Sequence, residues 1–100
     1  MEAGKWRLVI DDGGITMREE GQTMKHEVKI KPEYYGAVLN GTKNFELRKD
    51  DRGYQVGDIV ILKEWDGDTY TGRDLALKIK YILRNCPEYG LSDGFCILGF

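Results

Sequence analysis

The chain has 100 residues, of which 41% are hydrophobic and 32% are charged. This size and composition predict one small folded domain and argue against a disordered or fibrous protein. No apolar run approaches the roughly 18 residues that a membrane-spanning helix needs, and no signal-peptide pattern opens the chain, so we expect a cytoplasmic protein. The formal net charge is −2, and acidic and basic side chains balance in residues 25–100. A broad basic surface for nucleic acid is therefore not expected, and any anion site must be a local pocket.

Residues 1–24 are interpreted as a leader or an extension that need not be ordered, ahead of a domain that spans residues 25–100. Two apolar runs at 5–10 and 15–18 flank an Asp/Gly-rich turn, which is typical of a β-hairpin. A second interpretation starts from Glu-Glu-Gly at 19–21, whose purine-rich codons resemble a bacterial ribosome-binding site just before Met24. On that interpretation Met24 is the natural start, and residues 1–23 are translated leader.

The domain is predicted to begin with a strand and a short helix. Apolar and charged side chains alternate at residues 26–31 with a period of two, which indicates a half-buried strand. Pro32 suits the first position of a helix of about nine residues, and Asn40-Gly41 is a typical stop. Three side chains form the apolar stripe of this helix: Tyr35, Val38 and Leu39.

Strand patterns resume at residues 43–49, 59–65, 75–84 and 95–100. In the first of these, Phe45 and Leu47 share one face, and Glu46 and Arg48 share the other. In the third, five apolar side chains are expected to point inward: Leu75, Leu77, Ile79, Tyr81 and Leu83. The order β-α-β-β-β-β, with one short helix after the first strand, predicts an α+β, mostly β fold. Short turns favour a largely antiparallel sheet, closed into a small barrel of about five strands that leaves no exposed edges.

Cysteine and histidine usage argues against a metal centre. Zinc sites need about four ligands, whereas the chain holds two cysteines, Cys86 and Cys96, and one histidine, His26. In a cytosolic protein the two cysteines are predicted to be buried free thiols. His26, near the beginning of a strand, is predicted to be a surface residue rather than a catalytic base. We expect no metal and no cofactor.

The segment after the predicted helix carries the pattern Gly-x-Lys-x-x-Glu-x-Arg: Gly41, Lys43, Glu46 and Arg48. With this motif between a helix and a strand, and with the segments 49–52, 56–58, 70–73 and 95–100 after it, the chain resembles ASCH domains of the PUA-like superfamily. The resemblance covers residues 26–100 and is strongest to an uncharacterised, often phage-associated branch. It implies a PUA-like β-barrel that binds RNA or a nucleotide derivative in a cleft beside the helix.

The chemistry of the motif side chains suits such a cleft. Glu46 and Arg48 are two residues apart on a strand and share a face. Arg48 offers a planar fork for a phosphate or a base edge, and Glu46 can accept from an amino group or orient Lys43. The structural alternative is a solvated strand face crossed by ion pairs, each worth roughly 0–1 kcal/mol.

Four further side chains are predicted to complete the RNA-contacting set: Lys49, Arg52, Trp65 and Tyr70. The two cations would face phosphate, and the two aromatic rings would stack on a base. The neighbouring Asp50 and Asp51 neutralise much of the charge in this segment, so a solvated loop is the alternative for the cations. The rings have the alternative of half-buried packing at a sheet edge.

Two other functions stay open beside RNA or nucleotide binding. Some small ASCH relatives resemble amidohydrolases of N4-acetylcytidine, in which the motif lysine acts with a threonine three residues later and a distant glutamate. Here Lys43 and Glu46 would be the catalytic pair, with Glu64 or Glu88 as the distant carboxylate. Glu46 occupies the position where these relatives have threonine, and it can hold a water but offers no hydroxyl. The other function is a protein-interaction domain in a phage context. In each case we expect a monomer that binds no membrane.

Overall fold

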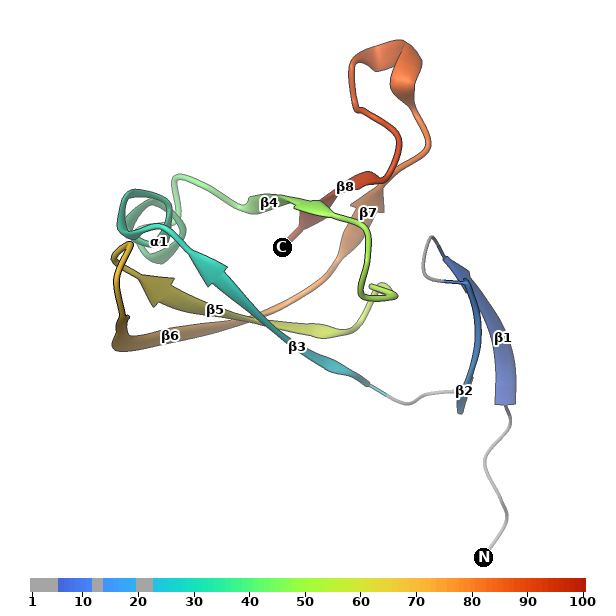
Figure 1. The fold of residues 1–100 in the computed structure, drawn as a ribbon, viewed down its shortest axis with the longest axis horizontal. Coiled ribbons are helices and arrows are strands. Elements are labelled where there is room, and N and C mark those ends of the chain that lie inside the picture. The colour runs from blue at the N-terminus through green and yellow to red at the C-terminus, as the bar shows by residue number, and fades with distance from the viewer. Residues whose placement is uncertain (1–5, 12–13, 20–22) are drawn as a thin grey trace, which may run out of the picture.

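Figure 1 shows the computed structural model, which describes residues 6–11, 14–19 and 23–100. β1 (Trp6–Asp11) and β2 (Gly14–Glu19) pair antiparallel in a two-stranded sheet of their own. The chain thus contains the hairpin that the Asp/Gly-rich turn predicted, and residues 12–13 of that turn lie outside the described residues. A natural start at Met24 stays a prediction.

The first three-stranded sheet has the order β3-β5-β6. β3 (Lys25–Ile30) and β5 (Ile59–Trp65) run parallel, which requires the long crossover through the helix and the next strand. β5 and β6 (Tyr70–Lys78) form an antiparallel hairpin. In its turn, Asp66 accepts a 2.9 Å hydrogen bond from the N–H of Thr69, and backbone donors of this kind lower the pKa of the Asp66 carboxyl.

The second three-stranded sheet has the order β4-β8-β7 and is antiparallel throughout. Its strands are β4 (Phe45–Lys49), β7 (Tyr81–Leu83) and β8 (Phe95–Gly99). The 3-10 helix η1 (Pro87–Tyr89) lies in the loop between β7 and β8, which Figure 1 shows extending away from the sheets. The mostly β class with one short helix is confirmed, with six strands in residues 25–100 instead of about five.

The additional strand arises because the predicted strand at 75–84 breaks at Ile79. The N–H of Ile79 donates to the carbonyl of Asp58 (2.8 Å) beside the first sheet, and the N–H of Lys80 donates to the carbonyl of Gly99 in the second (2.7 Å). The chain therefore passes from one sheet to the other, and the alternation of inward and outward side chains shifts by one residue. Ile82 turns inward, and the prediction of inward side chains is wrong for two exposed residues: Tyr81 and Leu83.

Helix α1 (Pro32–Leu39) has eight residues and begins at Pro32 as predicted. It ends where Gly41 takes a φ of +83°, a left-handed conformation that suits glycine. Tyr35 and Val38 are buried, whereas Leu39, the third member of the predicted stripe, is exposed. Leu39 is the last residue of the helix, next to the exposed Asn40 and Gly41.

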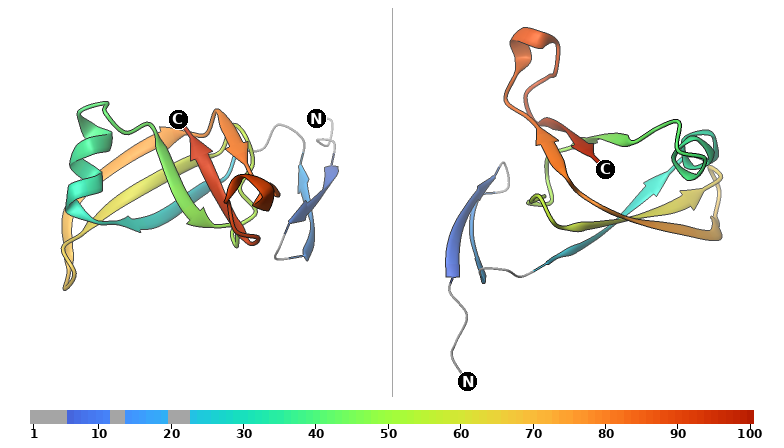
Figure 2. Two further views of the ribbon diagram at one scale, coloured as in Figure 1. Left: turned by 90° about the horizontal axis from the view of Figure 1, so that it is seen from above. Right: turned by 180° about the vertical axis from the view of Figure 1, so that it is seen from behind.

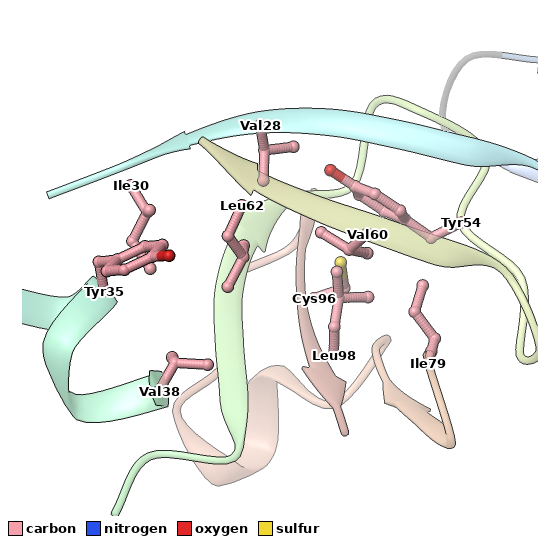
Figure 3. Close-up of a cluster of buried hydrophobic side chains, with 10 residues drawn as sticks. All are labelled: Val28, Ile30, Tyr35, Val38, Tyr54, Val60, Leu62, Ile79, Cys96 and Leu98. Atoms are coloured by element: carbon pink, nitrogen blue, oxygen red, sulfur yellow. The ribbon is translucent and has the colours of Figure 1, made fainter. Parts of the chain in front are cut away.

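The two sheets face each other across one hydrophobic core, shown in Figure 3. Its buried members come from both sheets, from α1, from the loop before β5 and from the break between β6 and β7: Val28, Ile30, Tyr35, Val38, Tyr54, Val60, Leu62, Ile79, Cys96 and Leu98. Each fully buried aliphatic side chain stabilises the fold by about 1.5–3 kcal/mol. Cys86 and Cys96 are both buried free thiols, as predicted.

His26 is buried, so its prediction as a surface residue is wrong. Its Nε2 lies 2.8 Å from Oδ2 of Asp58, and its ring packs edge-on against Tyr54 with centroids 4.8 Å apart. Asp58 also accepts from the N–H groups of Met24 (3.2 Å) and Gln55 (3.0 Å). The cause is tertiary, because the loop at 54–58 brings Asp58 to the start of β3, where it gives the imidazole a partner inside the protein.

The two sheets adjoin along one side and leave two strand edges on the other. Figure 2 shows the chain continuing from β6 of the first sheet into β7 of the second. On the opposite side, β3 and β4 are edge strands in the order of pairing. The strand pairings thus define two open sheets, and closure into a barrel is not confirmed.

Candidate functional site

The charged face of β4 points into the protein and its apolar face points out. Glu46 is 4% exposed, whereas Phe45 is 44% and Leu47 is 56% exposed. The predicted alternation is correct, but the face bearing Glu46 and Arg48 is not a solvated strand face. A buried carboxylate has lost its hydration and needs compensation from nearby donors and cations.

Two motif cations provide that compensation for Glu46. The Lys43 ammonium donates to Glu46 Oε1 and, at 2.7 Å, to the carbonyl of Phe45. On the other side, Arg48 Nη1 lies 3.7 Å from Glu46 Oε2. The predicted trio of Lys43, Glu46 and Arg48 therefore forms one ion-paired cluster.

Arg48 also links the two strand edges. Its Nη1 donates to the backbone carbonyl of Lys29 in β3 at 2.9 Å. The guanidinium thus lies across the gap between β3 and β4. Its side chain stays about a quarter exposed, so part of the planar fork is open to a ligand.

A pocket of about 350 Å³ lies at this gap. Residues of β3, the start of α1, β4 and the end of β5 line it: Lys29, Ile30, Lys31, Tyr34, Glu46, Leu47, Arg48 and Trp65. Its volume lies within the range of small-molecule sites. The lining combines three cations, one buried carboxylate and two aromatic rings, which can hold an anionic group, accept from an amino group and contact a flat ring.

Trp65 lines this pocket, and Tyr70 stands beside it. The two rings meet edge-on with centroids 4.8 Å apart. The Lys29 ammonium lies 4.0 Å from the centroid of the Trp65 ring and 5.7 Å from that of Tyr70. Tyr70 contacts Trp65 but is not among the residues that line the pocket.

Lys49 and Arg52 lie in a second pocket, of about 360 Å³, rather than in the first. Its lining is Leu47, Arg48, Lys49, Asp51, Arg52, Tyr54 and Phe95. Arg48 and Leu47 are common to both pockets. Asp50 does not neutralise the loop, because it is buried with an oxygen 2.6 Å from Nε of Arg84.

The two candidate distant carboxylates have other surroundings. Glu64 is buried, accepts from the Thr71 hydroxyl at 2.7 Å and lies 3.2 Å from Nε of Arg73. Glu88 lies in η1, on the loop before β8. Among the described residues, no hydrogen bond or ion pair joins either carboxylate to Lys43.

Sequence reasoning missed Lys29 and Ile30 as pocket residues. Both read as ordinary members of an alternating strand. Their place at the site depends on β3 being an edge strand that lies across the gap from β4, and this arrangement leaves no local signal in the sequence.

Among residues 23–100, no group of three or more histidine, cysteine or carboxylate side chains is arranged to hold a metal ion. In the described part of the chain, no helix is long and apolar enough to cross a membrane.

Comparison with known proteins identifies the family. A family described as a domain of unknown function, DUF3850, matches residues 25–100, and the chain belongs to it. The chain is also 46% identical over 54 residues to an uncharacterised 12.9 kDa protein in the GpA 3′ region of Escherichia phage P2. That match covers 54% of the chain and 50% of the phage protein, so the chain spans about half the length of this curated relative.

Proposed function

We propose that this member of the DUF3850 family is an RNA- or nucleotide-binding module related to ASCH domains, and that the pocket between β3 and β4 is its binding site. The observation that carries the proposal is the arrangement around Arg48. Its guanidinium neighbours the buried carboxylate of Glu46 and lines the same pocket as the ring of Trp65. A cation, an acceptor and a flat ring around one cavity match the phosphate, the edge and the face of a nucleotide.

The order of elements along the chain supports the proposed relationship to ASCH domains. In chain order, the helix ends at Leu39, Gly41 and Lys43 follow, and β4 brings Glu46 and Arg48 to the pocket. We further propose that the two sheets form a PUA-like barrel opened between β3 and β4. The 2.9 Å bond from Arg48 to the Lys29 carbonyl spans that opening, so a ligand there would contact both edges.

The second pocket supports a ligand longer than one nucleotide. Lys49 and Arg52 line it, and Arg48 stands between it and the first pocket. A base held in the first pocket would leave its neighbouring phosphate near these two cations. We therefore favour short single-stranded RNA over a free nucleoside.

The test is a binding titration of the full chain with a fluorescent single-stranded RNA at low salt. Arg48→Ala should weaken binding about tenfold or more, because a hydrogen bond to a charged group contributes about 1.5–3 kcal/mol. Lys78→Ala is the matched control, since it removes one exposed positive charge where β6 pairs with Ile59 at the other end of β5. Equal affinity in wild type and Arg48→Ala would exclude this site.

The salt dependence tests whether the site is a local pocket. With two or three phosphate contacts, the slope of log affinity against log salt should lie near −1.4 to −2.1, at about −0.7 per contact for a single strand. A much steeper slope would indicate a broad basic surface.

N4-acetylcytidine belongs among the ligands, because its conversion to cytidine by wild type but not Lys43→Ala would favour catalysis over binding.

A further inference from the structure

The outer face of the second sheet is apolar and exposed. Pairing places Phe45, Gly99 and Tyr81 in one row across the sheet. The next row holds Leu47, Ile97 and Leu83, and the last holds Lys49 and Phe95. Exposed fractions reach 67% for Tyr81, 38% for Leu83 and 36% for Phe95.

This face is large for a monomer. Its five most exposed apolar side chains leave roughly 450 Å² open to water, taking about 150–250 Å² for each large side chain. The largest apolar patches on monomers are about 300–600 Å² and are often functional. Two such faces in contact would bury about 900 Å² before any rim atoms, close to the ~1,000 Å² of a specific interface.

We propose that the occupant of this face is a second copy of the chain, packed sheet against sheet about a twofold axis. The axis would cross the strands at Ile97, so that β8 lies antiparallel over β8 of the copy. Sheets packed in this way lie ~10 Å apart with strands within about 30° of each other. Leu47, Ile97 and Leu83 then each face the same residue of the copy.

The shape of β8 favours this arrangement over others. Phe95 and Gly99 lie two residues on either side of Ile97 and share its face. The twofold axis therefore sets each Phe95 ring over the Gly99 of the copy, in the gap between that copy's Phe45 and Tyr81. A twofold axis along the strands would instead set glycine over glycine and leave a void, which close-packed interiors avoid.

Charge is consistent with self-association. Among the outward side chains of β4, β7 and β8, the only charged one is Lys49. Under the proposed axis it would lie over the Phe45 ring of the copy and would not meet its own counterpart. An isologous contact needs such a self-complementary surface. This inference replaces the expectation of a monomer. The proposed face shares Leu47, Lys49 and Phe95 with the second pocket, and its test is made without RNA.

The test is sedimentation velocity of the full chain from low to high micromolar concentration. Wild type should show a reversible monomer–dimer equilibrium. Gly99→Val should weaken the dimer about tenfold or more, because the added side chain fills the gap that receives Phe95. The substitution suits the fold, since a Cβ at Gly99 would meet Tyr81 atoms no closer than 3.5 Å, and thermal unfolding of the variant checks this.

Two further variants complete the design. Leu83→Lys should abolish the dimer, because it sets two ammonium groups face to face. Val56→Lys, which replaces an exposed apolar residue outside this sheet, should leave the dimer unchanged. The proposal would be overturned by a wild type that stays monomeric or that forms larger species without a defined stoichiometry. Tighter association of Gly99→Val would also overturn it, because nonspecific attraction grows with added apolar surface.

Discussion

Arg48 Nη1 lies 3.7 Å from Glu46 Oε2 on the inward face of β4, although the two apolar side chains between and before them face solvent. In β4 the charged side chains thus face inward and the apolar side chains face solvent, the reverse of the usual arrangement. The inward ion pair serves the pocket, and the outward apolar side chains serve the proposed dimer contact. One alternating strand therefore contributes to two surfaces.

Glu46→Ala should destabilise the domain by about 2–3 kcal/mol, because it leaves Lys43 and Arg48 beside a site without their shared counter-charge. Removal of one partner of a fully buried pair costs about 3–5 kcal/mol, and the partial exposure of both cations reduces the effect here. Urea unfolding measures it. Glu27→Ala, which breaks an exposed pair with Lys63 at 3.8 Å, is the control and should change stability by less than about 0.5 kcal/mol. Equal effects in the two variants would contradict the account.

Asp58→Ala should lower the free energy of unfolding by about 3 kcal/mol, more than most carboxylate substitutions do. The reason is that His26 and the N–H groups of Met24 and Gln55 lose a buried acceptor. Chemical unfolding of Asp58→Ala beside Asp68→Ala separates this effect from general loss of negative charge. Asp68 lies in the exposed β5–β6 turn, and its variant should stay within about 0.5 kcal/mol of wild type. A mild effect of Asp58→Ala would show that the buried pair contributes little to the fold.

Stability should fall between about pH 9 and pH 11. Burial, reinforced by the negative charge of Asp50, raises the pKa of the Cys96 thiol from 9.0 to about 11. In that window the unfolded chain releases the thiol proton while the folded chain retains it, so rising pH favours unfolding. The contribution is fully present below pH 9, and its loss amounts to about 2 kcal/mol.

Urea unfolding at pH 8.5 and pH 11 measures this change, with Cys96→Ala as the matched variant. The variant should lose less stability over the window than wild type. Burial also raises the pKa of Tyr54, so some decline persists in the variant above pH 10. An identical decline in the two proteins would show that the thiol does not cause it.

Trp65→Ala should weaken RNA binding about tenfold, because stacking of one base on an aromatic ring contributes about 1–3 kcal/mol. Trp65→Phe should retain most of the affinity, since a flat ring remains. Tyr89→Ala, which removes a highly exposed ring in η1, is the control. If both tryptophan variants bind like wild type, the base does not stack there.

The sequence was sufficient where the information is local. Pro32 and Gly41 determine the ends of α1, and the period of two identifies β3 and β4. The motif spacing places Lys43 and Glu46 in contact.

The features that could not be predicted depend on contacts between residues far apart in the chain. Alternation separates two faces of β4 without telling which one is buried, so the inward position of Glu46 was not predictable. The break at Ile79 depends on a hydrogen bond to Asp58, 21 positions away along the chain, and the burial of His26 depends on the same residue. Lys29 joins the pocket only through the meeting of two strand edges.

The most direct test of the binding site is a map of amide and indole chemical shifts in the full chain, titrated with short single-stranded RNA at low salt. Shifts should centre on Lys29, Glu46 and Arg48 and on the indole N–H of Trp65, and Arg48→Ala should remove them. Weaker shifts should extend to Lys49 and Arg52. Saturable shifts confined to other surfaces, or none at all at low salt, would contradict the account.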